Sequence, residues 1–163
     1  MKQDLFAVWL QANKEHFALI DNSYKNYYSQ ENHRGYEGEV NTELATYGDA
    51  VLKLALCKIL WPNNGLTTEK EKYESDKVLV RKIAKYYCIL DYLKYDKSDR
   101  NRPQDYEYKG KKNKNPRKYI ATAVEACLGA IYMEDDGFGR VLTIVGEWKN
   151  IIDDQEDLCE RKK

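Results

Sequence analysis

The sequence lacks several features that would assign a protein class at once. It contains no internal repeat, no phosphate-binding glycine loop and no dinucleotide-binding fingerprint. Lysine and arginine together number 27, as do aspartate and glutamate, so the formal net charge of zero indicates no class of partner. At 163 residues the chain is long enough to bury a substantial core as a single domain.

Zinc-binding cysteine motifs and long apolar runs are also missing. The four cysteines, Cys57, Cys88, Cys127 and Cys159, lie far apart and match no zinc-binding spacing. Cys57 and Cys127 fall on apolar helix faces, which is typical of reduced core cysteines in a cytosolic protein. The first four residues include an acid and no apolar run of signal-peptide length follows them, and no stretch approaches the roughly 20 apolar residues that span a bilayer. We therefore expect a soluble, cytoplasmic protein with no membrane partner.

Helical periodicity dominates what is present and predicts an all-α fold. The clearest helix covers residues 42–60, where apolar residues recur every three or four positions. Residues 1–152 are expected to form one domain, followed by a charged and frayed tail over 153–163. Further helices are expected at 3–20, early in 22–40, at 67–87, from residue 91, at 120–132 and at 141–148.

Two of these helices carry an acid inside an apolar pattern. Asp49 follows Gly48 in the first, and Glu125 precedes Gly129 by one turn in the second. Burying a lone carboxylate costs several kcal/mol, so each acid must be paired, hydrogen-bonded or metal-bound. Small neighbours would let the two helix backbones approach closely, so we expect two buried carboxylates to share one small space. Either acid alone is compatible with a solvated helix face, but the pair argues against that interpretation.

A basic segment precedes the second acidic helix. Residues 94–118 contain ten lysines and arginines against four acids, a net charge of about plus six. A solvated loop would explain this composition, but its position beside two acids favours phosphate binding. The candidate phosphate-binding side chains are Arg100, Arg102, Lys109, Lys111, Lys112, Lys114, Arg117 and Lys118.

Several segments, taken in order, resemble the ribonuclease III domain. Residues 18–26 (ALIDNSYKN) resemble the early family segment ALTHxSYAN, and residues 41–52 resemble the family signature NERLEFLGDAVL. Residues 121–132, continuing into Asp136-Gly137-Phe138, resemble ADxFEAxxGAIYLDgGf. The resemblance covers most of the chain and implies the all-α endonuclease fold of that family.

The chain departs from the family pattern at two of its four acidic positions. Residue matching places Ala45 at the first signature glutamate and Thr122 at the later aspartate, while Asp49 and Glu125 are kept. Similar motif forms, LAYxGDA and STAFEA, are found in the Mini-III branch, whose members have no separate double-stranded-RNA-binding domain. No stretch of this chain resembles that domain either. We therefore place the chain near Mini-III, and expect the basic segment to bind the RNA.

The resemblance implies a Mg²⁺-dependent endoribonuclease that cuts double-stranded or structured RNA, with ribosomal-RNA precursor processing as its task. Asp49 and Glu125 would be the catalytic residues and would hold Mg²⁺ or Mn²⁺, and Thr122 would hold a metal-bound water. Two alternatives stay open. One is a catalytically degenerate domain of the same fold that binds RNA or serves in a ribonucleoprotein, and the other is an unrelated helical protein-interaction domain.

The resemblance also implies a homodimer, because each site of the family cuts one strand of a duplex. An aromatic residue three positions before the signature aspartate enters the partner in the long family members. Here that position is Thr46, with Tyr47 beside it, so we expect a dimer through the signature helix with a changed contact.

Overall fold

The computed structural model describes residues 2–108 and 116–160, with side chains described up to residue 154. The fold is all-α, as predicted, and the described residues form no strand. Their β-type pairing is an isolated bridge between Ile20 and Lys94. Within these ranges, no helix combines the length and the apolar character that crossing a membrane requires.

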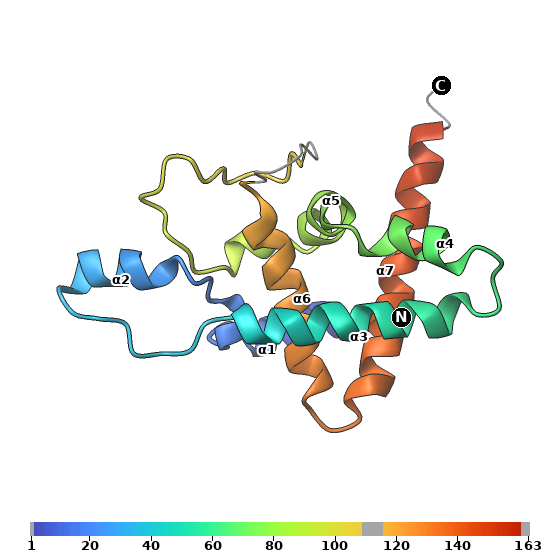
Figure 1. The fold of residues 1–163 in the computed structure, drawn as a ribbon, viewed down its shortest axis with the longest axis horizontal. Coiled ribbons are helices and arrows are strands. Elements are labelled where there is room, and N and C mark those ends of the chain that lie inside the picture. The colour runs from blue at the N-terminus through green and yellow to red at the C-terminus, as the bar shows by residue number, and fades with distance from the viewer. Residues whose placement is uncertain (1, 109–115, 161–163) are drawn as a thin grey trace.

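Two long helices cross at the centre of the molecule. Helix α3 (Thr42–Leu60) runs across α6 (Lys118–Tyr132) and α7 (Gly137–Glu160) in Figure 1, and it packs against both. Most of α6 is buried, including nearly every residue from Tyr119 to Ile131. The predicted helices at 42–60 and 120–132 are therefore confirmed, and together they form the interior of the domain.

The crossing of α3 and α6 depends on two glycines. A Cβ atom placed on Gly48 would lie 1.6 Å from the carbonyl oxygen of Glu125. A Cβ atom on Gly129 would lie 2.2 Å from the carbonyl oxygen of Leu44. No real side chain tolerates such distances, so the predicted close approach of the two backbones is confirmed.

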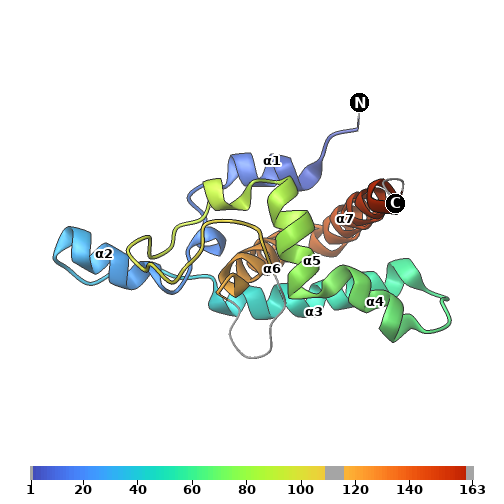
Figure 2. The same cartoon turned by 90° about the horizontal axis from the view of Figure 1, so that it is seen from above.

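Helix α1 (Leu5–Ala12) lies on the opposite side of the molecule from α3 in Figure 2, and it packs against α7. Asp4 caps it by accepting hydrogen bonds from the first-turn amides, and the Tyr87 hydroxyl donates to the same carboxylate. The prediction of one helix over 3–20 is wrong. The helix ends at Ala12, the side chain of the next residue, Asn13, donates to the Trp9 carbonyl, and a short 3₁₀ helix, η1 (Phe17–Leu19), follows.

The segment predicted as one helix over 67–87 is broken. Helix α4 (Leu66–Glu74) ends where Ser75 adopts an extended backbone, and the Ser75 side chain then caps α5 (Asp76–Val78). The chain continues through a π-helical stretch, η2 (Leu79–Ala84). Serine favours this capping role over a helix interior, which explains the break.

Two further predictions differ in their boundaries. The short helix expected from residue 91 is instead a 3₁₀ turn, η3 (Ile89–Asp91). The final helix was expected at 141–148, and the residues of its predicted packing face are buried there. Helix α7 is longer, however, and continues to Glu160, into the segment from 153 that the sequence analysis assigned to a charged tail.

Helix α2 (Tyr24–Asn32) projects away from the other helices in both views (Figures 1 and 2) and has no buried residue. The excursion that contains it starts and ends at one place in the core. The Asp21 amide donates to the Lys94 carbonyl at 2.9 Å, and the Asn41 amide donates to the Ile20 carbonyl at 2.9 Å. The expected short helix followed by a loop is thus confirmed, with both ends anchored side by side.

We predict that Gly48→Ala destabilises the domain by about 3 kcal/mol, because its methyl group cannot fit against the Glu125 carbonyl without moving a helix. Thermal unfolding followed by circular dichroism measures the change. The matched control is Gly146→Ala in α7, where a Cβ meets no atom within 4 Å. That variant should gain about 0.5–1 kcal/mol from its higher helix propensity. Equal melting temperatures for Gly48→Ala and the parent would contradict the close approach.

Candidate active site

The two acids singled out in the sequence lie at the crossing of α3 and α6. Asp49 follows Gly48, and Gly48 lies against the backbone of Glu125, so the packing of the two glycines also places the two carboxylates on adjoining turns. Their charges interact, because the negative charge of Asp49 contributes to a raised pKa at Glu125. The structure therefore brings the two predicted residues together.

Asp49 differs from its expected environment. Its side chain is 40% exposed, and its Oδ2 atom lies 2.7 Å from Nζ of Lys53, one turn along the same helix. The prediction of two buried carboxylates is therefore wrong for Asp49. A carboxylate at this position stays in contact with water and with a cation, which avoids the cost of burying it. Glu125 is also of intermediate exposure, but burial is the main cause of its raised pKa.

Burial raises the pKa of Glu125 to about 8, and the negative charges of Asp49 and Asp76 add to the shift. Lys118 and Lys53 act in the opposite direction and lower the same pKa. Five charged side chains from three helices, α3, α5 and α6, thus form one electrostatic cluster. Negative charge exceeds positive charge in this cluster by one, counting every acid as ionised.

Sequence reasoning missed two members of this cluster. Lys53 could have been found, because a lysine four residues after an aspartate on a helix lies beside it. Asp76 gave no such signal. It reaches the cluster because the chain breaks at Ser75 and restarts as α5, and the periodicity of the segment predicted one uninterrupted helix.

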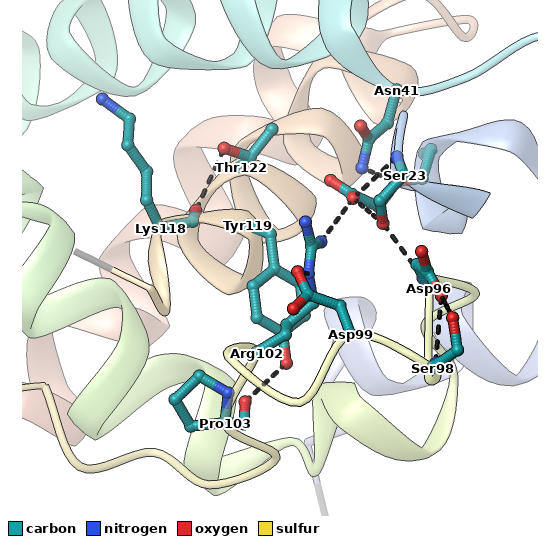
Figure 3. Close-up of polar contacts among 12 residues, drawn as sticks. Ser23, Asn41, Asp96, Ser98, Asp99, Arg102, Pro103, Lys118, Tyr119 and Thr122 are labelled. Atoms are coloured by element: carbon teal, nitrogen blue, oxygen red, sulfur yellow. Dashed lines mark hydrogen bonds and ion pairs between the residues drawn. The ribbon is translucent and has the colours of Figure 1, made fainter. Parts of the chain in front are cut away.

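Thr122 lies one turn before Glu125 on α6. Its hydroxyl donates to the Lys118 carbonyl at 3.0 Å, and Figure 3 shows the two residues on neighbouring turns. Lys118, Thr122 and Glu125 share one face because they are separated by four and three positions. The side chain is partly exposed, and its expected role in holding a water stays a prediction.

Two of the candidate phosphate-binding arginines form ion pairs with aspartates of the same domain. The Arg102 guanidinium lies 2.7 Å from the Asp21 carboxylate and 4.7 Å from the centre of the Tyr119 ring (Figure 3). Arg117 lies 2.6 Å from Asp105. Sequence analysis took both as phosphate-binding groups, but in this structure both are partly buried and paired with protein carboxylates. That expectation therefore finds no support at these two positions.

The remaining candidates divide into two groups. Arg100 is exposed, and the Lys118 side chain is 70% exposed with its Nζ 3.8 Å from Asp76. Both are placed where a phosphate can reach them. Four further lysines lie outside the described residues, so their predicted role stays untested: Lys109, Lys111, Lys112 and Lys114.

A family model described as the ribonuclease III domain matches residues 42–136, which include both helices of the crossing and all five charged residues. The chain belongs to the ribonuclease III domain family. This membership supports an endoribonuclease with an RNA substrate. Searches of curated proteins and of solved structures returned no match.

The site of this ribonuclease III domain offers oxygen donors that suit a hard cation. Mg²⁺ commonly binds through one or two carboxylates and keeps several waters. Asp49 and Glu125 supply two carboxylates. Burial raises the Glu125 pKa and nearby negative charges add to the shift, and a cation would relieve this second cause. No group of three or more His, Cys, Asp or Glu side chains suited to a metal occurs in the described parts of the chain. The two carboxylates fit an ion that keeps most of its waters.

The raised pKa of Glu125 makes stability depend on pH. The folded state holds this proton up to about pH 8, whereas the unfolded chain loses it near 4.5. The penalty on folding is therefore absent below pH 4.5, grows as pH rises and is complete above 8. We predict that Glu125→Gln is more stable than the parent at pH 8 without metal. The difference should shrink toward pH 5 by up to about 1.4 kcal/mol per pH unit.

Melting curves at pH 5 and pH 8 in the presence of a chelator measure this dependence. The matched control is Glu71→Gln, which removes an exposed carboxyl on α4. A stability difference between Glu125→Gln and the parent that is the same at both pH values would contradict the raised pKa.

Proposed function

We propose that this domain is a Mg²⁺-dependent endoribonuclease that hydrolyses double-stranded or structured RNA and leaves 5′-phosphate ends. The observation that carries the proposal is the convergence of Asp49 and Glu125 at the glycine crossing, within a ribonuclease III domain. A-form RNA suits such a site, because its phosphates and 2′-hydroxyls are accessible while its base edges are largely hidden.

The roles follow from the chemistry of the side chains. Asp49 and Glu125 hold Mg²⁺ or Mn²⁺, and the Thr122 hydroxyl orients a water at the same face of α6. When bound, the ion polarises the scissile phosphate and makes a water more acidic. Lys118 and Arg100 attract the RNA backbone because both charges are exposed, and Lys118 lies on the same face of α6 as Thr122 and Glu125.

One observation favours a second candidate, an RNA-binding domain without catalysis. Ala45 and Thr122 stand where the family pattern has acids, so the site carries two fewer carboxylates than that pattern. The motif forms LATYGDA and ATAVEA resemble those of Mini-III, and on this ground we propose activity and choose ribosomal-RNA precursors as the first substrate to test. Incubation with long duplex RNA, with and without Mg²⁺, separates the two candidates. Metal-dependent shortening of the RNA supports the enzyme, and binding without shortening supports the alternative.

We predict that Asp49→Asn and Glu125→Gln each lower the cleavage rate by at least about 100-fold, because each removes a carboxylate that holds the ion. Gel assays under single-turnover conditions measure the rates, and circular dichroism checks that the fold is kept. Glu43→Gln is the control, because Glu43 is an exposed carboxyl on the first turn of α3, two positions from Ala45 and about 200° away around the helix. A cleavage rate equal to that of the parent in either variant would contradict the assignment of that residue to the active site.

We also propose a homodimer through α3, as the two-strand cut requires. Two large apolar side chains on this helix and a third directly after its end are exposed at seven-residue spacing: Tyr47 at 51%, Leu54 at 58% and Trp61 at 73%. Leu54 and Trp61 line a shallow hollow together with Cys57, Lys58 and Phe138. An apolar stripe of this length on a small domain favours burial against a second copy. Cys57, predicted to be a core residue, is instead half-buried at this surface.

If α3 forms the dimer interface, one substitution on it should convert the dimer to a monomer. Leu54→Glu places a charge in the middle of the stripe, so the variant should sediment near the chain mass of 19.2 kDa while the parent sediments near twice that value. Analytical ultracentrifugation at micromolar concentration makes the comparison. Val8→Glu is the control, since Val8 is 40% exposed on α1, on the opposite side of the molecule from α3 in Figure 2. A parent that sediments at 19.2 kDa would exclude the dimer.

A further inference from the structure

The ion pair between Lys53 and Asp49 is not explained by a contribution to stability. Its ammonium lies 2.7 Å from Oδ2 of Asp49, but the two side chains are 45% and 40% exposed. Ion pairs of this kind, one turn apart on a helix, contribute little to folding because water screens them. The ammonium nevertheless occupies a carboxylate oxygen that a divalent cation would need.

The charge of Lys53 also reaches beyond its partner. It lowers the pKa of Glu125 on the facing helix, as does Lys118, which lies one turn before Thr122. Lys53 lies one turn after Asp49 on α3, and Lys118 lies two turns before Glu125 on α6, so both helices carry a lysine near an acid of the candidate site. Lys53 carries its charge on a flexible four-carbon stem, so the ammonium can move several ångströms while the backbone stays fixed.

The number of negative charges at the site limits how many divalent cations it can balance. The family pattern with four acids carries enough negative charge to balance two divalent cations, whereas Asp49 and Glu125 balance one. Ala45 and Thr122 remove the other two negative charges. The Lys53 ammonium, 2.7 Å from Asp49, lies beside the proposed ion site and carries a positive charge that a phosphate bound there would attract.

We propose that Lys53 contacts the RNA phosphate at the active site, and that its ammonium occupies Asp49 only while no divalent cation does. A cation that binds Asp49 displaces the ammonium, which then turns to a non-bridging phosphate oxygen of the bound RNA. The inference rests on the proposed function. In this role Lys53 links ion binding to RNA binding through a single side chain. When RNA is absent, the Lys53 ammonium competes with the ion for Asp49.

Three variants of the full chain test this role. Lys53→Ala removes the charge, Lys53→Arg keeps it, and Lys14→Ala removes one exposed lysine two positions after the end of α1. Calorimetry with Mn²⁺ alone is the first measurement. Lys53→Ala should bind Mn²⁺ about two- to fivefold more tightly than the parent, because the competing ammonium is gone. Lys14→Ala should bind it as the parent does.

Cleavage of duplex RNA in Mg²⁺ at several salt concentrations is the second measurement. Lys53→Ala should lose at least about tenfold in kcat/KM, and the slope of log(kcat/KM) against log[salt] should fall by up to about 0.9, as for one lost phosphate contact on a DNA duplex. Lys53→Arg should restore most of both quantities, and Lys14→Ala should leave both unchanged. A purely structural ion pair would not move the two measurements in opposite directions.

The outcomes separate this inference from the function on which it rests. A parent that neither cleaves nor binds duplex RNA overturns the proposed function, and the role of Lys53 with it. A parent that cleaves while Lys53→Ala binds Mn²⁺ no more tightly, or keeps its kcat/KM and salt slope, overturns the role of Lys53 alone.

Discussion

The backbone contact between α3 and α6 is the constraint on which this structure depends. Gly48 lies against the carbonyl of Glu125, and Gly129 lies against the carbonyl of Leu44, so each helix presents a glycine to the other. The same contact builds the core and the candidate site, because the residue after Gly48 is Asp49 and the residue that Gly48 touches is Glu125. A change that separates the helices therefore separates the carboxylates as well.

Electrostatics at this crossing work against the stability of the metal-free domain. Burial and two neighbouring acids raise the pKa of Glu125 to about 8, and Lys53 and Lys118 compensate only in part. Elsewhere in the domain, at Asp21, a buried negative charge is balanced. Asp21 is buried but satisfied, because it accepts from Ser23 and pairs with Arg102. Charge is balanced where it anchors the fold and left unbalanced where an ion and a substrate are proposed to bind.

The sequence was informative about features that repeat along a helix and silent about features that depend on one residue or on distant partners. Apolar periodicity predicted α3 and α6, and the small residues beside Asp49 and Glu125 predicted their approach. The helix end before Asn13 and the break at Ser75 were missed, because a single side chain that bonds the local backbone decides each. The pairing of Arg102 with Asp21 joins residues 81 positions apart, and no local pattern encodes it.

The excursion over residues 22–40 leaves the core at Asp21 and returns at Asn41, two points fixed by adjacent backbone hydrogen bonds. Since α2 buries no residue, the length of this segment is uncoupled from the packing of the rest of the domain. The entropy of closing a loop grows only with the logarithm of its length, so doubling it would cost roughly 0.6 kcal/mol. Segment 22–40 is therefore a place where the chain can accept insertions, deletions or a fused peptide while the packing of the helical core stays as it is.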